Sequence, residues 1–419
     1  MLNIIHLSES DSEGGAAKAS FRINKALNKN SDLRSILRVN TKLSDDIFVK
    51  GSSSKVRLLN KLKCYLSLKI NKLQKTENPI LHSLSLFPSF LDNELNNTIA
   101  DIVHLHWIQG EMISIEEIGR IKKPIVWTMH DSWPFCGAEH HPNGFHDLRY
   151  VEGYYRQNRN SFNKGIDLDK LTWERKLKNW KNNMFFVSPS NWLASCAKNS
   201  KLFFQKDIRV IPHPISIDIF KPFPKDFARE RYQLPLEKKL ILFGSLSAYD
   251  NDMKGWKIFE STVNKISKKI PNLGIVIFGS PKPNYYPKLD VPVFFIGRIY
   301  QDQKLSILYS AVDVMVNPSK MESFGLTASE AQTCGTPVVA FNATGLKDIV
   351  ADRKTGYLAD PFSSESLARG ICWVLGNKER IKLLSHNSRE RAIKLWSYEI
   401  ISKKYKELYL EIIENDKDL

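Results

Sequence analysis

Short, mostly apolar runs alternate with longer segments of helical periodicity along this chain of 419 residues. The runs of the first half lie at 4–7, 102–106, 125–129 and 185–187. Between the first two, the segment 16–27 has apolar residues at 16, 19, 23 and 27, which is the spacing of one helical face. Strands that alternate with helices favour a parallel sheet covered on both faces. We therefore predict a doubly wound α/β fold.

A second series of the same kind follows a proline-rich region. The stretches 211–214 and 220–224 contain four prolines and are typical of a domain linker. Beyond them, strands are expected at 240–243, 275–278, 293–296, 312–316 and 338–341. We therefore expect two α/β domains, 1–213 and 214–396, followed by a C-terminal helix in 397–419. Ligands of such sheets bind at the carboxyl ends of the strands, here expected to face a cleft between the domains.

The segment 318–331 (PSKMESFGLTASEA) is the part of the chain most suggestive of a binding site. It follows a predicted strand and opens a helix, whose free N–H groups suit a diphosphate. Gly325 permits a tight turn and a close approach of a ligand to the backbone. Glu322 and Glu330 can each accept two hydroxyl hydrogen bonds, as carbohydrate recognition requires. Taken alone, the same pattern also fits a capped helix with two solvated glutamates.

The whole string resembles the E-x7-E signature of glycosyltransferase family 4. The likeness extends through 334–340 (CGTPVVA), 344–350 (TGLKDIV) and 354–358 (KTGYL). This resemblance implies the GT-B architecture, with two Rossmann-like domains facing a cleft and a C-terminal helix that returns to the N-terminal domain. It implies that the N-terminal domain binds the acceptor and that the C-terminal domain binds a nucleotide sugar. Ser323, Phe324, Gly325 and Leu326 would contact the donor, with Glu322 at its sugar and Glu330 at its ribose.

Two segments of the first half extend the resemblance. Gly14 and Gly15 resemble the glycine-rich first loop of the family, which passes close to the diphosphate and the transferred sugar, although a plain strand–helix turn has the same pattern. The string 130–135 (HDSWPF) resembles the H-D-x-W-P-F string of a bacterial polysaccharide-assembly subgroup, in which the histidine reaches the donor sugar. We therefore expect a catalytic role for His130. The segments 187–193 and 210–215 match further landmarks, with His-Pro where Asn-Gly is common.

The chain departs from the family at the donor phosphates. The family often supplies an arginine and a lysine there, but Ser245 stands at the arginine position. Lys254 remains, followed by Gly255, and is the expected catalytic and phosphate-binding cation. Arg298 follows a predicted strand and is a second donor-binding candidate, with a solvated charge at a strand end as the alternative.

We expect no metal and no cofactor beyond the nucleotide sugar. Asp250 and Asp252 imitate the D-x-D metal motif of the other large transferase fold, but a GT-B site neutralises phosphate with helix termini and basic residues. Glu139, His140, His141 and His146 could suggest a metal cluster, yet acceptor-side or surface histidines fit this fold better. The five cysteines include no C-x-x-C pair and indicate free thiols.

The chain carries a formal net charge of +16, much of it in one short segment. Residues 50–76 hold eight Lys or Arg and no Asp or Glu, and leucine or isoleucine recurs at 59, 62, 66, 70 and 73. A basic amphipathic helix is typical of anionic membrane surfaces, while a core-docked helix with a solvated basic back is the alternative. Nucleic acid is not expected, because aromatic residues do not interleave with the basic run.

Together these features predict a retaining glycosyltransferase. It would move a hexose from a UDP- or GDP-sugar to a sugar acceptor, expected to be lipid-linked, in surface polysaccharide or exopolysaccharide biosynthesis. A GT-B nucleotide-sugar epimerase and a catalytically silent sugar- or membrane-binding protein are the alternatives. The N-terminus lacks the features of a signal peptide, and no apolar run approaches the ~20 residues that cross a bilayer. We expect a cytoplasmic protein, peripheral at the inner face of the plasma membrane.

Overall fold

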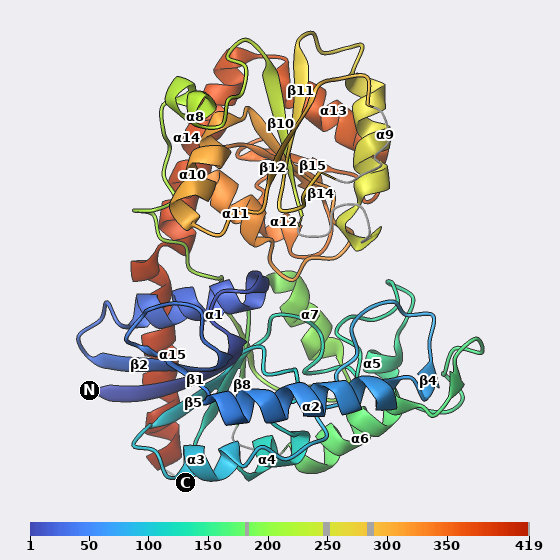
Figure 1. Cartoon of the computed structure of the whole chain (residues 1–419), viewed down its shortest axis with the longest axis vertical. Helices are drawn as coiled ribbons and strands as arrows, with labels where there is room; N and C mark the ends of the chain where they lie inside the picture. The colour runs from blue at the N-terminus through green and yellow to red at the C-terminus, as the bar shows by residue number, and fades with distance from the viewer. Residues whose placement is uncertain (181–183, 246–251, 283–288, 418–419) are drawn as a thin grey trace. The chain divides into compact units, whose positions relative to one another are not determined.

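The computed structural model of the protein describes residues 1–180, 184–245, 252–282 and 289–417. The chain forms two compact units (Figure 1). Unit 1 comprises Met1–Pro214 and Ile401–Leu419, and unit 2 comprises Ile215–Ile400. Each unit contains a parallel sheet with helices on both faces, so the predicted doubly wound α/β architecture is confirmed.

The sheet of unit 1 has the strand order β3-β2-β1-β5-β6-β8-β9, with every pair parallel. Its strands are β1 (Leu2–Ser10), β2 (Leu33–Thr41), β3 (Val49–Gly51), β5 (Ile102–Leu105), β6 (Ile125–Thr128), β8 (Met184–Ser188) and β9 (Ile208–Val210). Four of these strands, β1, β5, β6 and β8, were predicted from the sequence. β2 was not predicted, and in this strand buried apolar positions alternate with polar ones.

Helices cover the two faces of this sheet according to the period of two in its strands. Ile102 packs with α1 (Gly14–Leu27) and with α15 (Tyr398–Lys417). The adjacent Val103 packs on the opposite face with α3 (Leu91–Asn96), α4 (Ile115–Arg120) and α7 (Asn191–Asn199). From Ile401 onward, α15 belongs to unit 1, which confirms the expected return of the C-terminal helix (Figure 1).

A long excursion separates β6 from β8. It contains α5 (Arg149–Glu152), β7 (Lys164–Gly165) and α6 (Leu168–Asn179), and β7 pairs antiparallel with β4 (Gln74–Lys75). The buried Lys176 ties α6 to the start of the excursion, because its Nζ donates to the carbonyl oxygens of Trp133 and Gly137 at 2.5 and 2.7 Å. Burial lowers the pKa of Lys176 to about 7.

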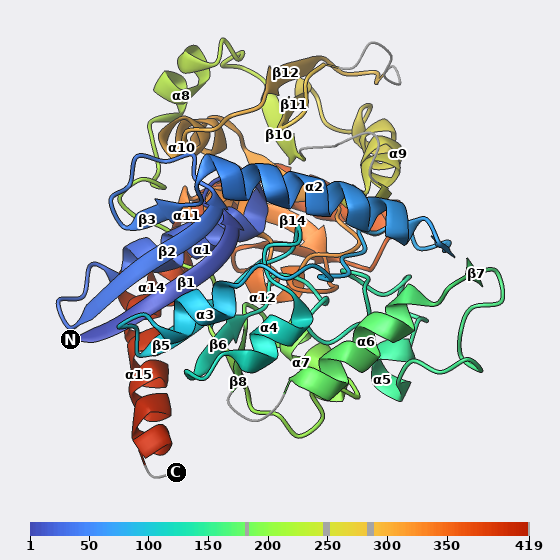
Figure 2. The same cartoon turned by 60° about the horizontal axis from the view of Figure 1, so that its bottom comes forward.

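Helix α2 (Ser54–Asn71) holds most of the basic segment, and Figure 2 shows it as one long helix. The face that it turns inward is polar, with Asn60, Lys63 and Ser67 buried. Its leucines are exposed instead, with Leu58 at 71%, Leu62 at 54% and Leu68 at 56%, while Ile70 near its end is partly buried. The alternative of a core-docked apolar face is therefore wrong. No helix in the described part of the chain is long and apolar enough to cross a bilayer.

The sheet of unit 2 has the order β12-β11-β10-β13-β14-β15, again with every pair parallel. Its strands are β10 (Lys239–Gly244), β11 (Leu273–Phe278), β12 (Val293–Gly297), β13 (Val314–Asn317), β14 (Val338–Phe341) and β15 (Gly356–Ala359). Five of the six were predicted. β15 was identified only as part of a motif.

The helices of unit 2 also divide between the two faces of its sheet. Leu240 and Leu242 pack toward α8 (Lys225–Arg231), α10 (Asp302–Ala311), α11 (Leu326–Thr333), α12 (Leu346–Ile349) and α14 (Lys378–Trp396). Ile241 and Phe243 pack toward α9 (Trp256–Ile266) and α13 (Ser364–Leu375) on the opposite face. A 3₁₀ turn, η1 (Asp252–Lys254), precedes α9.

The interpretation of 220–224 as linker is wrong. Phe220 is fully buried in the core of unit 2, and the Phe223 N–H donates to Ser310 Oγ at 3.1 Å. This stretch is irregular because of its prolines, but its aromatic side chain gives it a place in the core. The junction between the units lies earlier, at Pro214 and Ile215.

Candidate active site

A short loop after β13 carries most of the predicted donor-binding residues. β13 ends at Asn317 and α11 begins at Leu326, with Gly325 as its N-cap residue at a φ of 102°. That φ is in the region that favours glycine, and a Cβ there would lie 2.9 Å from Leu346 Cδ2. Gly325 is therefore required both for the turn and for the packing of α12 behind it. Ser323 and Phe324 precede this turn.

Glycine also brings η1 against this loop. Gly255 has a φ of 73°, and a Cβ there would lie only 2.0 Å from the carbonyl oxygen of Pro318. The Lys320 N–H donates to the Met253 carbonyl at 2.8 Å, and Lys320 Nζ lies 2.5 Å from Asp252 Oδ2. The backbones of two segments that are distant in sequence are thus held in direct contact.

Lys254 and Glu322 form an ion pair across this junction, with 2.6 Å between Nζ and Oε1. Their side chains are 33% and 19% exposed, so both heads remain within reach of a ligand. The backbone of Glu322 is held by the next loop, because its carbonyl accepts from the Gly345 N–H at 2.8 Å and its N–H donates to Thr344 Oγ1 at 3.3 Å. The structure therefore brings the predicted cation and the predicted sugar-binding carboxylate together.

Glu330 lies inside α11 and is 2% exposed. Its Oε2 accepts a hydrogen bond from the Tyr309 hydroxyl at 2.9 Å, so α10 orients this carboxylate. Ser245 follows β10, and its carbonyl accepts from Ser280 Oγ at 2.8 Å. Tyr309 and Ser280 could not be identified from the sequence, because Tyr309 reaches Glu330 from α10 and Ser280 reaches Ser245 from the turn after β11.

Arg298 lies apart from the ion pair. It lines a pocket of about 530 Å³ with Arg231, Tyr232 and Lys304, at the ends of α8 and β12 and on α10. Lys254 and Glu322 do not line this pocket. Three cations converge there, so the pocket suits an anion, but the structure does not join Arg298 to the other predicted donor-binding residues.

In unit 1, Gly14 and Gly15 open the 14-residue helix α1. Gly14 has a φ of 89°, and a Cβ there would meet nothing within 4 Å. Glycine is therefore favoured at position 14 by the backbone conformation, and not by a lack of space for a side chain. Both residues are exposed, so the N–H groups of the first turn are accessible to an anion.

His130 follows β6 and is the outer member of a chain of imidazoles. Its Nε2 lies 3.1 Å from His106 Nδ1, and His106 Nε2 lies 2.9 Å from His6 Nδ1. His213 stacks against His130 with ring centroids 5.0 Å apart. Because His106 contacts both His6 and His130 through its two ring nitrogens, the tautomers of the three rings are coupled.

Burial keeps these histidines neutral. It lowers the pKa of His6 to about 3 and that of His130 to about 4, and it lowers the pKa values of His104, His106 and His213 well below the usual 6.5. A neutral His130 can accept or donate a hydrogen bond to a ligand at physiological pH. The sequence contained a signal for these histidines, since His104 is a polar residue in an otherwise apolar strand and His106 directly follows that strand.

His6, His104 and His106 offer ring nitrogens within 4.8 Å of one another, a spacing compatible with a metal ion. However, His104 is already engaged by the Tyr409 hydroxyl at 2.6 Å and by Thr128 Oγ1 at 2.8 Å. Its ring stacks on His106 with centroids 4.3 Å apart. A metal would have to displace these hydrogen bonds, so the geometry favours a hydrogen-bonded chain.

Three of the other groups weighed as metal ligands have partners of their own. His140 lies 2.6 Å from Asp131 Oδ2 and 2.8 Å from Ser83 Oγ, and His141 lies 3.2 Å from Ser132 Oγ. Asp252 is paired with Lys320, whose hydrogen bond and charge lower the pKa of that carboxyl. Asp250 lies outside the described residues.

Comparisons with known proteins concern the family and the fold of this chain. Residues 224–391 match the family model described as glycosyl transferases group 1. The chain is similar to the D-inositol 3-phosphate glycosyltransferase of Mycobacteroides abscessus, with 31% identity over 180 residues, 40% of this chain and 39% of the relative. The chain spans about half the length, or less, of the first such curated relatives.

Two solved structures show the same fold over nearly the whole chain. Sucrose-phosphate synthase from Thermosynechococcus elongatus has a TM-score of 0.69 and 18% identity, covering 99% of this chain and 100% of its own. HepE from Anabaena, in complex with UDP and glucose, has a TM-score of 0.63 and 16% identity, covering 98% and 100%. The two Rossmann-like units are therefore those of a GT-B fold, and the match to the group 1 glycosyltransferase model lies within unit 2.

Proposed function

We propose that this chain is a retaining hexosyltransferase that moves a hexose from a nucleotide diphosphate sugar to a sugar acceptor. The observation that carries the proposal is the Lys254–Glu322 ion pair, 2.6 Å long, beside the first turn of α11. It places a cation, a carboxylate and the free N–H groups of a helix start together, inside the segment that matches the group 1 glycosyltransferases. A diphosphate and the hydroxyls of a sugar need this combination.

In this proposal the donor separates the ion pair. Lys254 and the N–H groups at Gly325 and Leu326 bind the diphosphate, while Glu322 accepts hydroxyl hydrogen bonds from the hexose and Glu330 accepts them from the ribose. The charge that develops on the departing diphosphate is stabilised by groups that are already in position. The leaving phosphate takes the proton of the acceptor hydroxyl on the same face of the sugar, which retains the anomeric configuration. No metal is required.

The likeness to HepE, crystallised with UDP and glucose, supports a UDP-sugar as the first donor to test. The names of the curated relatives indicate D-inositol 3-phosphate as one class of acceptor. We favour a lipid-linked sugar and a role in surface polysaccharide biosynthesis, because 130–135 (HDSWPF) resembles the string of a polysaccharide-assembly subgroup.

The outward leucines of α2 support docking on an anionic membrane. Lys55, Arg57, Lys61 and Lys69 are exposed on the same helix, and Lys72 is exposed at its C-cap. Lys63 is turned inward and donates to the Pro88 carbonyl at 2.7 Å. A helix that exposes leucines and cations together fits the boundary between lipid headgroups and acyl chains. Each cation near an anionic surface contributes about 1 kcal/mol.

A donor screen tests the proposed reaction. Release of nucleotide diphosphate is measured across UDP- and GDP-sugars, with and without a bacterial membrane extract. We expect release from one donor, increased by the extract, and its loss in the Lys254→Met variant. The matched control is Lys257→Met, an exposed lysine one residue inside α9. Equal release by parent and Lys254→Met, or isomerised donor as the sole product, would reject the proposal.

Liposome sedimentation tests the role of α2. Replacing Lys61, Lys69 and Lys72 with Gln should weaken binding to anionic vesicles, and salt should weaken binding of the parent, because the Debye length falls to about 3 Å at 1 M. The control replaces Lys378, Lys382 and Lys394 on α14, which makes the same change in charge. Equal binding by both triple variants would assign the attraction to overall charge and contradict a membrane role of α2.

A further inference from the structure

A basic pocket of about 530 Å³ lies in unit 2, beside the edge strand β12. The C-terminal end of α8, the end of β12 with the turn after it, and the first turn of α10 form its walls. The Tyr232 hydroxyl joins two of these walls, because it donates to the Lys304 carbonyl at 2.6 Å. Lys254, Glu322 and Glu330, which we assign to the donor, do not line the pocket. Its volume is within the range of small-molecule sites.

Two arginines in this pocket differ from the other arginines of unit 2. Six of the eight arginines in that unit are held by carboxyl or carbonyl oxygens: Arg229, Arg353, Arg369, Arg380, Arg389 and Arg391. The other two are Arg231 and Arg298, and both line the pocket. No hydrogen bond or ion pair joins either guanidinium to another residue within the described part of the chain. The two arginines of unit 2 without a protein partner there thus meet at one place.

A lysine adds a third charge, and no acidic residue balances the three among the described residues of the lining. Lys304 lies in the first turn of α10 and is exposed. Asp302 is in the same turn but does not line the pocket. Burial raises the pKa of Tyr232 to about 12, so its hydroxyl adds no negative charge. Three cations that share a pocket repel one another, and an anion bound between them removes this repulsion.

The chemistry of the lining favours a phosphate ester. A guanidinium group binds phosphate through two parallel N–H bonds, and a phosphate monoester carries a charge of about −1.5 to −2 at pH 7. A carboxylate has only one charge to set against three cations. Ile296 and Ile299, which are partly buried, provide apolar contacts for a carbon skeleton. The ring of Tyr300, which is 76% exposed, provides a flat surface beside them.

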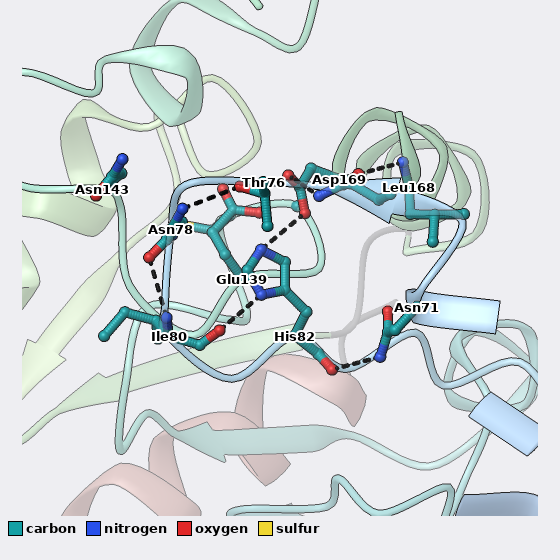
Figure 3. A network of polar contacts seen from close by, with 12 residues as sticks. Asn71, Thr76, Asn78, Ile80, His82, Glu139, Asn143, Leu168 and Asp169 are labelled. Carbon is teal, nitrogen blue, oxygen red and sulfur yellow. Dashed lines mark hydrogen bonds and ion pairs between the residues drawn. The ribbon is translucent and has the colours of Figure 1, made fainter. Parts of the chain in front are cut away.

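The positive charge of this pocket is not a general consequence of the net charge of +16. A pocket in unit 1 has four acidic residues in its lining: Glu139, Asp147, Glu152 and Asp169. Figure 3 shows part of it, where the Ile80 N–H donates to Asn78 Oδ1 at 3.2 Å and His82 lies 3.5 Å from Asp169. Polar groups there engage one another, whereas the two arginines of the basic pocket have no such partner.

We propose that the basic pocket binds a small organic phosphate at a site separate from that of the donor. Arg231, Arg298 and Lys304 hold the phosphate, while the isoleucines and Tyr300 contact the organic part. In this assignment Arg298 is not a donor-binding residue. The inference goes beyond the proposed reaction and does not depend on it, because it stands on unpaired cations outside the donor-binding loop.

Isothermal titration calorimetry on the full chain tests the pocket, with inorganic phosphate, glucose 6-phosphate and glycerol 3-phosphate as probes. The esters should bind the parent more tightly than inorganic phosphate does, and glucose and glycerol should not bind. The double variant Arg231→Gln/Lys304→Gln should weaken binding of the esters at least tenfold. Arg369→Gln/Lys382→Gln makes the same change in charge at exposed residues of unit 2 and should leave binding within twofold of the parent.

A second variant separates recognition of phosphate from attraction by charge alone. Arg298→Lys keeps the charge but removes the planar fork, so binding of the esters should weaken severalfold. Dihexanoyl phosphatidic acid, a soluble phospholipid, distinguishes the two sources of such a group. Tighter binding than glycerol 3-phosphate would assign the pocket to a lipid headgroup, and weaker binding would assign it to a soluble ester.

The same titrations with UDP present decide whether the site is separate. The affinity for glucose 6-phosphate should be the same with and without UDP. Binding of none of the phosphates, equal binding by the parent and Arg231→Gln/Lys304→Gln, or displacement of the esters by UDP would overturn the proposal. Full donor hydrolysis by Lys254→Met together with intact binding of glucose 6-phosphate would instead reject the proposed reaction alone.

Discussion

The contribution of the Lys254–Glu322 ion pair to stability does not explain why the two residues are held together. An ion pair with this exposure contributes about 0–1 kcal/mol to stability. Two glycines at positive φ, Gly255 and Gly325, let its two loops come together without strain. Glycine is also the residue that allows a ligand to approach the backbone closely. In the proposed function, the pair consists of two binding groups that neutralise each other until the donor arrives.

Glu322 and Glu330 should have different kinetic phenotypes. Glu322→Ala should lower kcat about tenfold or more, because we place this carboxylate at the sugar that undergoes transfer. Glu330→Ala should mainly raise the KM for the donor, because ribose contacts exist in the ground state and in the transition state. Steady-state kinetics on the donor found in the screen measure both. Glu365→Ala, at an exposed residue on α13, is the control, and full activity of Glu322→Ala would contradict the site.

The histidine chain predicts how stability depends on pH. The folded pKa values of His6 and His130 are about 3 and about 4, below the usual 6.5. At a pH between the folded and the usual pKa value, the unfolded chain therefore binds more protons than the folded protein does. The free energy of unfolding should therefore be highest above about pH 6.5 and fall as the pH drops toward 4. For the fully buried His6 the loss is up to about 1.4 kcal/mol per pH unit.

Urea unfolding at a series of pH values between 4 and 7 measures this dependence. His6→Gln should flatten it relative to the parent, because the variant has no imidazole to protonate on unfolding. His386→Gln changes an exposed histidine on α14 and should leave the curve unchanged. A His6→Gln variant with the slope of the parent would show that His6 is protonated in the folded protein.

At the scale of elements, the contact between η1 and the loop before α11 depends on Gly255. Gly255→Ala combines a positive φ with a Cβ placed 2.0 Å from the Pro318 carbonyl, so the loop must move. Gly297→Ala is a matched control, because its φ is 76° and nothing lies within 4 Å of its Cβ. Gly297→Ala should lose about 1–2 kcal/mol of stability because of its positive φ, and Gly255→Ala should lose more because the steric clash adds to the same cost.

Donor hydrolysis should separate the two glycine variants. Gly255→Ala displaces Lys254 from Glu322 and should lose most of its activity even where it is folded, whereas Gly297→Ala should retain it. Circular dichroism and thermal melts confirm the fold of each variant. Equal activity in both would show that the position of η1 does not matter for the reaction.

At the scale of the whole molecule, the last helix completes unit 1. The Tyr409 hydroxyl lies 2.6 Å from His104 Nδ1, and the Tyr405 hydroxyl lies 2.9 Å from Thr128 Oγ1, so residues about 300 positions apart share one core. Chain entropy opposes such contacts, and only the buried apolar surface of α15 offsets it.

Tyr409→Ala should therefore be strongly destabilising, by about 3–5 kcal/mol, the range for truncating a buried aromatic side chain. Leu410→Ala changes the next residue, which is 43% exposed, and should cost far less. Chemical denaturation of both variants measures the difference. Similar stability of the two would mean that α15 does not contribute to the core of unit 1.

Much of the fold was predictable from the sequence because it depends on local patterns. Runs such as 240–243 and 338–341 are buried on both faces of a parallel sheet, and only such strands are apolar at every position. Gly325 and Glu322 were identifiable for the same reason, since a strand, a glycine turn and a helix follow one another within a few residues. β2 was missed because a strand with polar positions does not differ clearly from a loop.

By itself, then, the sequence determined the two α/β units, the returning helix and the identity of the residues at the start of α11. Tertiary structure alone decided which of them meet. Lys254 reaches Glu322 across 68 residues, His106 engages His130 from a neighbouring strand, and α2 turns its polar side inward while its leucines face outward. The physical reason is that the spacing of apolar and polar residues shows only that a segment has two different sides. Which environment each side receives depends on surfaces contributed by distant parts of the chain.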